Sequence, residues 1–395
     1  MPWSHVSPMD QKKQLVGDYF RHVFTLAELS DRYGVSPKTI YKWVARFESD
    51  GAKGLADRSS RPHSSPQQTP QHLVDAILEL QARHPWGAKK LRKILTIRHP
   101  DAPWPSVTTF SSILERAGCV RTRARRRSPL HPGKPSSPIV APNLVWSADF
   151  KGQFKTLDGR YCYPLTVTDN FSRYLLACQG LASTATHLVK PVFAKVFRDY
   201  GLPDRIRTDN GVPFATPTAL GRLSSLSAWW VRLGILPELI EPGKPQQNGR
   251  HERMHRTLKA ETTRPPAATC RAQQRTFNRF RQHYNDVRPH EAIELATPAS
   301  LHTPSVRPYP EKLPPLQYPA HFETRYVSYN GGMRWRTHWV SVSRVLEGDY
   351  IGLEEVDTRT WDVYYGRLRI GRFFEQLLRI EDRFGRLFRE VPKGR

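Results

Sequence analysis

The sequence predicts a multidomain protein, with all-α helix-turn-helix regions at the N-terminus, a central α/β region and a small β-barrel at the C-terminus. Three observations support this fold class. Apolar residues recur at helical spacing between residues 11 and 118, strand-like runs alternate with a helical segment after residue 143, and short strands broken by glycine fill residues 322–387. At about 100–200 residues per domain, a chain of 395 residues accommodates two to four domains.

Charge and composition narrow the possible functions. The 61 Lys and Arg outnumber the 36 Asp and Glu, for a net charge of +25, with +11 in residues 1–130, +11 in 131–319 and +3 in 320–395. Such an excess attracts polyanions and favours nucleic acid as a partner. We expect a cytoplasmic protein without a membrane segment, because the sequence shows no export signal, no apolar run of about 18 residues and no Cys-x-x-Cys pair.

Residues 10–57 predict a helix-turn-helix DNA-binding domain. Thr25 and Glu28 form a capping box before one helix, Gly34 supplies the turn, and Ser36 caps a second helix that begins with proline. The second helix would present basic and polar side chains to a major groove. These side chains are Lys38, Thr39, Tyr41 and Lys42. An ordinary helical hairpin is the alternative.

Two linkers and a second helical region follow. Residues 58–70 are rich in Ser, Pro and Arg and predict a linker, and residues 71–120 predict a second helix-turn-helix-like domain of three short helices. Residues 121–142 predict a basic, proline-rich linker. We expect its five arginines to contact DNA phosphates, with a solvated charge run as the alternative. They are Arg121, Arg123, Arg125, Arg126 and Arg127.

The α/β region is expected over residues 143–305. Strand-like runs at 144–150, 161–168 and 173–178 are joined by short turns and predict an antiparallel meander. A helix over 186–200 and a strand over 204–209 follow, which gives an α/β core. Residues 320–388 then predict the small β-barrel.

Three carboxylates stand at positions from which they can converge on one site. Asp149 and Asp209 each lie at the end of a strand run, and Glu252 lies near the start of a helix. Carboxylate oxygens bind hard divalent cations, and two Mg²⁺ about 3.5–4 Å apart can clamp an in-line phosphoryl displacement. Further along the same helix, Arg256 is basic and Lys259 shares the face of Glu252, so that both are candidate DNA contacts.

Five ordered motifs resemble those of bacterial insertion-sequence transposases with a retroviral-integrase-like DDE core. They span residues 146–152, 167–173, 208–211, 245–253 and 284–290. The resemblance implies an RNase-H-like fold for residues 143–305, with Asp149, Asp209 and Glu252 as catalytic and metal-binding residues. It also implies Mg²⁺ as cofactor, for which Mn²⁺ can substitute, and chemistry in which hydrolytic nicking of element ends precedes attack of the freed 3′-hydroxyl on another strand.

The same resemblance implies partners and location. The expected partners are double-stranded DNA, at the element's inverted repeats and at the target, and further copies of the chain in at least a dimer. The expected location is the bacterial cytoplasm, in association with the nucleoid. The sequence departs from the family in two ways: the 42 residues between Asp209 and Glu252 are more than is typical, which predicts an inserted loop within 213–228, and no His/Cys zinc module precedes the core.

Other carboxylates compete with the proposed triad. Asp169 lies in a tight turn beside Arg173 and is interpreted as structural, paired with that arginine. Glu238, Glu241 and Glu261 compete with Glu252 but lack the glycine-containing loop that precedes it.

Two other classes of function also stay open. Residues 251–255 read His-Glu-Arg-Met-His and satisfy the HExxH pattern of zinc peptidases, although the surrounding helix is basic rather than apolar. A non-catalytic DNA-binding regulator derived from a transposase is the other alternative, which would have no need of all three carboxylates.

Overall fold

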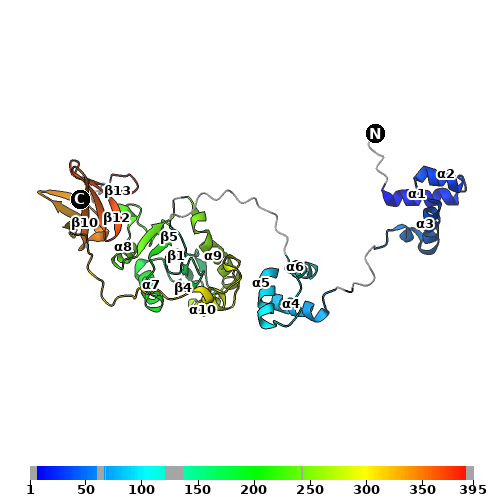
Figure 1. Cartoon of the computed structure of the whole chain (residues 1–395), viewed down its shortest axis with the longest axis horizontal. Coiled ribbons are helices and arrows are strands. Elements are labelled where there is room, and N and C mark those ends of the chain that lie inside the picture. Colours follow the sequence, from blue (N-terminus) through cyan, green and yellow to red (C-terminus); the bar gives the residue numbers. More distant parts are fainter. Residues whose placement is uncertain (1–6, 60–65, 67, 121–136, 242, 388–395) are drawn as a thin grey trace. The chain divides into compact units, whose positions relative to one another are not determined.

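The computed structural model describes residues 7–59, 66, 68–120, 137–241 and 243–387. Its contacts divide the chain into two units, residues 1–70 and 71–395, which are described separately (Figure 1). Among the described residues, no helix has the length and apolar character needed to cross a membrane.

The first unit is a small helical bundle. It consists of α1 (Pro8–Phe20), α2 (Leu26–Tyr33), α3 (Pro37–Asp50) and the 3-10 turn η1 (Gly51–Leu55). The capping box expected at the start of α2 is present, Gly34 ends that helix in a left-handed conformation with φ 65°, and Ser36 accepts a hydrogen bond at the start of α3. The bundle closes around the buried Leu15, Leu29, Ile40, Val44 and Leu55.

Three further helices follow in the second unit. They are α4 (Gln71–Arg83), α5 (Ala88–Arg98) and α6 (Val107–Arg116), each amphipathic, and their apolar faces share one core that includes Ile77, Leu91 and Phe110. The predicted three short helices are therefore present.

A mixed β-sheet forms the centre of the second unit. Its strands are β1 (Val145–Phe150), β2 (Phe154–Lys155), β3 (Tyr161–Asp169), β4 (Leu175–Leu181), β5 (Arg205–Thr208) and β6 (Leu236–Leu239). Strand β3 pairs antiparallel with β1 and with β4, whereas β5 pairs parallel with β1 and β6 parallel with β5. The sequence predicts the meander and β5, but neither β2 nor β6.

Helices cover both faces of this sheet (Figure 1). One face packs against α7 (Thr186–Tyr200) and α8 (Ser225–Arg232) through an aromatic core that contains Trp146, Phe193 and Trp230. The other packs against α9 (Gly249–Thr262) and α10 (Cys270–Asp286) through Leu175, Met254 and Phe277. The mixed sheet between two helical layers is the RNase-H-like core that the sequence predicts. Short elements η3 (Pro245–Asn248), η4 (Glu291–Ile293) and α11 (Pro298–Leu301) flank α9 and α10.

The C-terminal strands form an open sheet, not the predicted barrel. Strands β13 (Arg379–Asp382), β12 (Leu368–Phe374), β11 (Thr360–Tyr365), β10 (Tyr350–Asp357) and β7 (Glu323–Tyr326) pair in that order, and β8 (Gly332–Trp335) pairs only with β9 (His338–Ser341) among the described strands. A short turn, η5 (Arg344–Leu346), joins β9 to β10. The sheet has no need to close, because residues of the α/β core cover part of its apolar face.

Those covering residues come from the segment in which the sequence predicts an inserted loop. Residues 213–224 contain the 3-10 turn η2 (Leu220–Arg222), whose Leu220 and neighbouring Leu223 are buried in the core of the C-terminal sheet. Gly221 has φ 64°, and a Cβ there would lie 3.2 Å from Ile370 Cβ, so glycine permits the close approach to β12. Arg386 also donates a hydrogen bond to the carbonyl of Pro217 at 3.1 Å.

Candidate catalytic and metal site

The two predicted aspartates lie at one edge of the sheet. Strands β1 and β5 are parallel neighbours, Asp149 lies near the carboxyl end of β1, and Asp209 directly follows β5. The carboxyl ends of adjacent parallel strands meet at the same edge, where α/β sheets commonly bind ligands. Burial and the charge of Asp209 raise the pKa of Asp149 to about 7, and the charge of Glu252 adds to this effect. The three carboxylates therefore interact electrostatically.

The turn after β5 holds Asp209 through local hydrogen bonds. The Gly211 N–H donates to Asp209 Oδ1 at 3.1 Å, and the Asn210 side-chain amide donates to the carbonyl of Ile240 at 2.7 Å. This second bond links the end of β5 to the end of β6. A Cβ on Gly211 would lie 3.2 Å from Asp209 Oδ2, so the glycine leaves room for the carboxylate. The Asp-Asn-Gly motif is thus explained by the shape of the turn.

Helix α9 brings Glu252 to the same region. Its buried face, which includes His251, Met254 and His255, lies against the sheet, while Glu252 is exposed in the first turn of the helix. A carboxylate in the first turn is favoured by the helix dipole. The approach to α9 is fixed by Gln247, whose amide donates to Glu241 Oε1 at 2.8 Å and accepts from the Glu241 N–H at 2.9 Å.

The competing carboxylates all have partners. Glu238 forms a buried ion pair with Arg207 at 2.7 Å, and Glu261 pairs with Arg288 at 2.5 Å. Glu241 binds Lys244 and Gln247. Over the described residues, by contrast, no ion pair with a lysine or arginine is recorded for Asp149, Asp209 or Glu252. Asp149 has its pKa raised by the charges of the other two carboxylates, and unneutralised carboxylates suit a divalent cation, so the donor set fits Mg²⁺.

The remaining competitor, Asp169, has a structural role, but its partners differ from the predicted one. Its carboxylate is buried and accepts hydrogen bonds from the Ser172 N–H at 2.8 Å, the Ser172 hydroxyl at 2.6 Å and the Asn143 N–H at 3.1 Å. Two donors from the turn and one from Asn143 hold this carboxylate, and no ion pair with the Arg173 guanidinium, which the sequence suggests, is present among the described residues.

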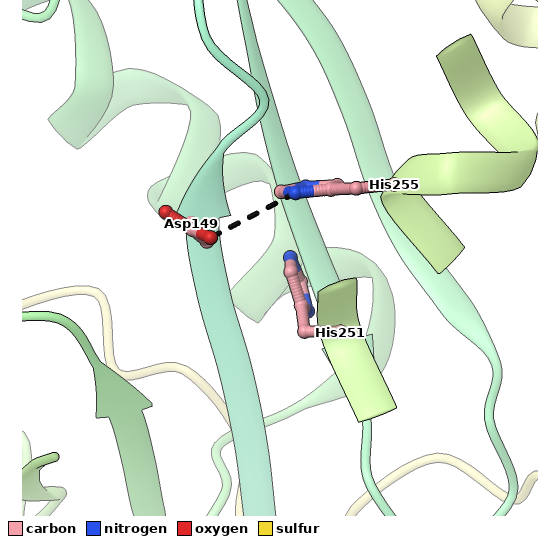
Figure 2. A group of neighbouring side chains, drawn as sticks. All are labelled: Asp149, His251 and His255. Atoms are coloured by element: carbon pink, nitrogen blue, oxygen red, sulfur yellow. Dashed lines mark ion pairs between the residues drawn. The ribbon is translucent and has the colours of Figure 1, made fainter. Parts of the chain in front are cut away.

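Two buried histidines lie beside Asp149 on the inner face of α9. His255 Nδ1 lies 3.7 Å from Asp149 Oδ2, and His251 lies one helical turn earlier (Figure 2). Nitrogens of the two rings and a carboxylate oxygen all lie within 4.8 Å of one another. Burial lowers the pKa of His251 to about 3 and lowers that of His255 strongly, so both rings are neutral at physiological pH.

Threonines of β3 fix these two rings. Thr166 Oγ1 lies 2.7 Å from His251 Nε2, 2.7 Å from His255 Nε2 and 3.1 Å from the carbonyl oxygen of Asp149. Thr168 Oγ1 lies 2.9 Å from His251 Nδ1. Both nitrogens of His251 are therefore occupied by hydroxyls, which argues against the HExxH interpretation, since that motif requires a ligating nitrogen from each histidine.

A basic pocket of about 320 Å³ lies on α9 and the β3–β4 turn. Four arginines line it, namely Arg173, Arg250, Arg253 and Arg288. Arg173 is notable because its Nε and Nη1 are buried without a hydrogen-bond partner in the described part of the chain. Burial and the charges of Arg250 and Arg253 lower its pKa to about 10. Such a cluster of guanidinium groups suits the phosphate of a nucleic acid.

The predicted DNA contacts are distributed over several elements. On α3, Lys38, Tyr41 and Lys42 are exposed, whereas Thr39 is half-buried and shares a 3.0 Å hydrogen bond with the cap residue Ser36. On α9, Arg256 and Lys259 are exposed. The five arginines of the basic linker lie outside the described residues: Arg121, Arg123, Arg125, Arg126 and Arg127.

Sequence reasoning missed the roles of the threonines and of the basic pocket. Thr166 and Thr168 stand at alternate positions of a strand, which reveals that they share a face but not which helix covers it. The motif around Arg173 and the motif around Arg250 are visible in the sequence, but their meeting in one pocket depends on the tertiary fold.

Comparisons with known protein families match both the N-terminal helical region and the α/β core. Integrase core domain families match residues 140–245 and 233–298, and the leucine-zipper of insertion element IS481 matches residues 11–83.

Similar proteins include the uncharacterized 39.2 kDa protein of insertion element IS476 from Xanthomonas euvesicatoria, 27% identical over 71% of this chain and 75% of that protein. The uncharacterized 31.7 kDa protein of insertion element IS407 from Burkholderia multivorans is 29% identical over 63% of this chain and 87% of its own length. The Gag-Pol polyprotein of baboon endogenous virus is 28% identical over 48% of this chain and 11% of the polyprotein. A solved structure of the HTLV-2 integrase catalytic core domain in complex with magnesium covers 41% of this chain and 98% of its own, with 16% identity and a TM-score of 0.33.

Proposed function

We propose that this chain, which belongs to the insertion-sequence transposases with a retroviral-integrase-like core, cleaves DNA at the ends of its element and joins the freed 3′-hydroxyl to another DNA strand. The observation that carries the proposal is that Asp149 and Asp209 lie at the carboxyl ends of adjacent parallel strands, with Glu252 near enough for its charge to raise the pKa of Asp149. None of the three forms an ion pair with lysine or arginine among the described residues.

The three carboxylates would hold Mg²⁺, or Mn²⁺ in its place. Bound there, such ions would supply the positive charge that stabilises the attacking and leaving oxygens of a phosphoryl transfer. The chain itself positions the carboxylates: the Gly211 N–H orients Asp209, and the packing of α9 on β3 sets the position of Glu252. Two strands and one helix would hold the triad in place, as in-line displacement requires.

Basic groups around the carboxylates would hold the DNA backbone. The pocket lined by Arg173, Arg250 and Arg253 adjoins α9, and the exposed Arg256 and Lys259 extend the same positively charged region along that helix. Phosphate contacts of this kind position a substrate without reading its sequence. We assign sequence recognition of the terminal inverted repeats to the exposed side chains of α3, and phosphate contacts to the basic linker.

Joining two element ends to a target requires at least two copies of the chain, so we propose a homo-oligomer that acts on double-stranded DNA. The site of action would be the bacterial cytoplasm, at the nucleoid. A non-catalytic regulator derived from such a protein would bind the same DNA but would not cleave it.

The experiment is a strand-cleavage assay with labelled DNA of the element's ends. Wild-type protein is expected to cleave in the presence of Mg²⁺, and Glu252→Gln is expected to bind the same DNA without cleaving it. Glu311→Gln, in an exposed carboxylate away from the site, serves as the matched control and should retain activity. Binding without cleavage by the wild type, at every Mg²⁺ and Mn²⁺ concentration, would support the regulator instead.

A further inference from the structure

His255 is buried against Asp149, but the carboxylate triad does not account for it. Its side chain is 6% exposed. It reaches the cluster from α9, three residues after Glu252, whereas Asp149 comes from β1 (Figure 2). A buried polar ring needs a partner for each nitrogen, so the contacts of the two nitrogens can be assigned one at a time.

The hydrogen bonds fix which nitrogen of His255 carries the proton. Thr166 has one hydroxyl proton, and the carbonyl oxygen of Asp149, which has no proton to donate, must accept it. Thr166 Oγ1 therefore accepts from both rings, and His255 Nε2 is the protonated nitrogen of its neutral imidazole. The other nitrogen, Nδ1, is left with a lone pair directed toward Asp149 Oδ2.

The distance between His255 Nδ1 and Asp149 Oδ2 shows whether the two atoms form a hydrogen bond or could both bind one cation. At 3.7 Å, Nδ1 and Oδ2 are too far apart for a hydrogen bond. Two ligand atoms that are each about 2.1 Å from one cation, at angles of about 110–120°, lie about 3.4–3.6 Å apart. The observed separation is close to that range. Histidine ligands also characteristically donate their second ring N–H to an oxygen, as His255 does to Thr166.

The spacing along α9 makes Glu252 the candidate for a further donor, although this exposed residue is not among the ligand atoms of Asp149, His251 and His255 that lie within 4.8 Å of one another. Residues three apart lie on neighbouring positions of a helix surface, so Glu252 and His255 form a Glu-x-x-His pair. Pairs of this kind hold transition-metal ions in helical carboxylate proteins. His251, by contrast, has both nitrogens occupied by Thr166 and Thr168 and acts as a support for its neighbour.

We propose that His255 Nδ1 is a ligand of a divalent cation that Asp149 also binds, with Glu252 as the third protein donor. The position beside His255 then has a mixed nitrogen and oxygen donor set and prefers Mn²⁺ or Zn²⁺ over Mg²⁺, whereas the position beside Asp209 has oxygen donors only. This inference rests on the proposed function, because it refines the metal site of the same carboxylates.

The test is electron spin-echo spectroscopy of the full chain with one equivalent of Mn²⁺, which detects nitrogen bonded directly to manganese. We expect a ¹⁴N coupling in the wild type and in His187→Asn, a variant of an exposed histidine on α7, and no coupling in His255→Asn. Calorimetric titration should show at least a tenfold loss of Mn²⁺ affinity in His255→Asn, with less than a threefold change for Mg²⁺.

The outcomes separate this inference from the proposed function. Two results would overturn the role of His255 and leave the carboxylate site intact. The first is Mn²⁺ binding to the wild type without a nitrogen coupling, and the second is a coupling that persists in His255→Asn. Wild-type protein that binds Mn²⁺ no better than Asp149→Asn would overturn both proposals. If circular dichroism shows that His255→Asn fails to fold, His255→Gln takes its place, and the absence of a coupling in the wild type still overturns the role of His255.

Discussion

Replacing Thr166 by valine tests the hydrogen-bonded cluster behind the carboxylates. Valine has nearly the shape of threonine, so the change removes the hydroxyl and little else. The Nε2–H groups of both histidines and the carbonyl of Asp149 then lose this partner in a fully buried environment. A buried polar group without a partner costs about 1–3 kcal/mol, so we expect a loss of about 3 kcal/mol in the free energy of unfolding.

Thr168→Val provides the matched comparison, since Thr168 bonds only one of the two rings, at His251 Nδ1. Its expected cost is about 1 kcal/mol. In a domain of this size, a loss of about 1 kcal/mol in the free energy of unfolding lowers the melting temperature by about 2–4 °C. The melting temperature should therefore fall by about 6–12 °C in Thr166→Val and about 2–4 °C in Thr168→Val. Differential scanning calorimetry measures both. Equal small shifts in the two variants would refute the assignment of Thr166 as the shared acceptor.

Three further predictions concern the site. Asp149 has its pKa raised from 3.8 to about 7, so the folded protein binds this proton more tightly than the unfolded chain does. Without metal, the free energy of unfolding should therefore fall as the pH rises from about 4 to about 7. Urea titrations should show this pH dependence in the wild type and not in Asp149→Asn. Since a cation binds the ionised carboxylate, calorimetry should also show Mn²⁺ affinity falling by up to about tenfold per pH unit below 7, and a flat profile would contradict the raised pKa. Gly211→Ala places a Cβ 3.2 Å from Asp209 Oδ2 and should slow strand cleavage at least tenfold with DNA affinity unchanged, whereas wild-type rates would show that the carboxylate tolerates displacement. Arg253→Gln should weaken DNA binding and reduce the salt dependence of the DNA affinity by about one counterion. Arg160→Gln, which changes an exposed arginine, is the control and should leave both quantities as in the wild type. Equal losses in the two variants would rule out a specific phosphate contact by Arg253.

Local signals in the sequence were enough to predict many of the elements. The caps at Thr25 and Ser36 are chemical features of a few neighbouring residues, and α7 occupies the range that the sequence predicts for this helix. The short parallel strand β6 escaped prediction because four residues carry little periodicity. The open C-terminal sheet escaped it for a different reason, since whether a sheet closes depends on what else covers its apolar face.

The candidate site likewise combines features that local sequence predicts with features that only the tertiary fold reveals. The three carboxylates could be singled out from motifs, because each stands in a distinctive local context. The hydrogen bonds of Thr166 join residues that are 85 and 89 positions apart, and no local pattern reveals such a contact. The HExxH pattern drew attention to the two histidines, but the chemistry it suggested requires a free nitrogen on each, and both nitrogens of His251 contact threonine hydroxyls.

The burial of Leu220 and Leu223 under the C-terminal strands bears on how the catalytic region is best produced for study. A fragment that stops near residue 305 would leave these two leucines, together with Val231, in contact with water, because the strands that shield them come later in the chain. Such a trimmed protein should be poorly soluble and prone to self-association. Recombinant versions intended for crystallisation should therefore retain the chain through Leu387, or exchange both leucines for polar residues.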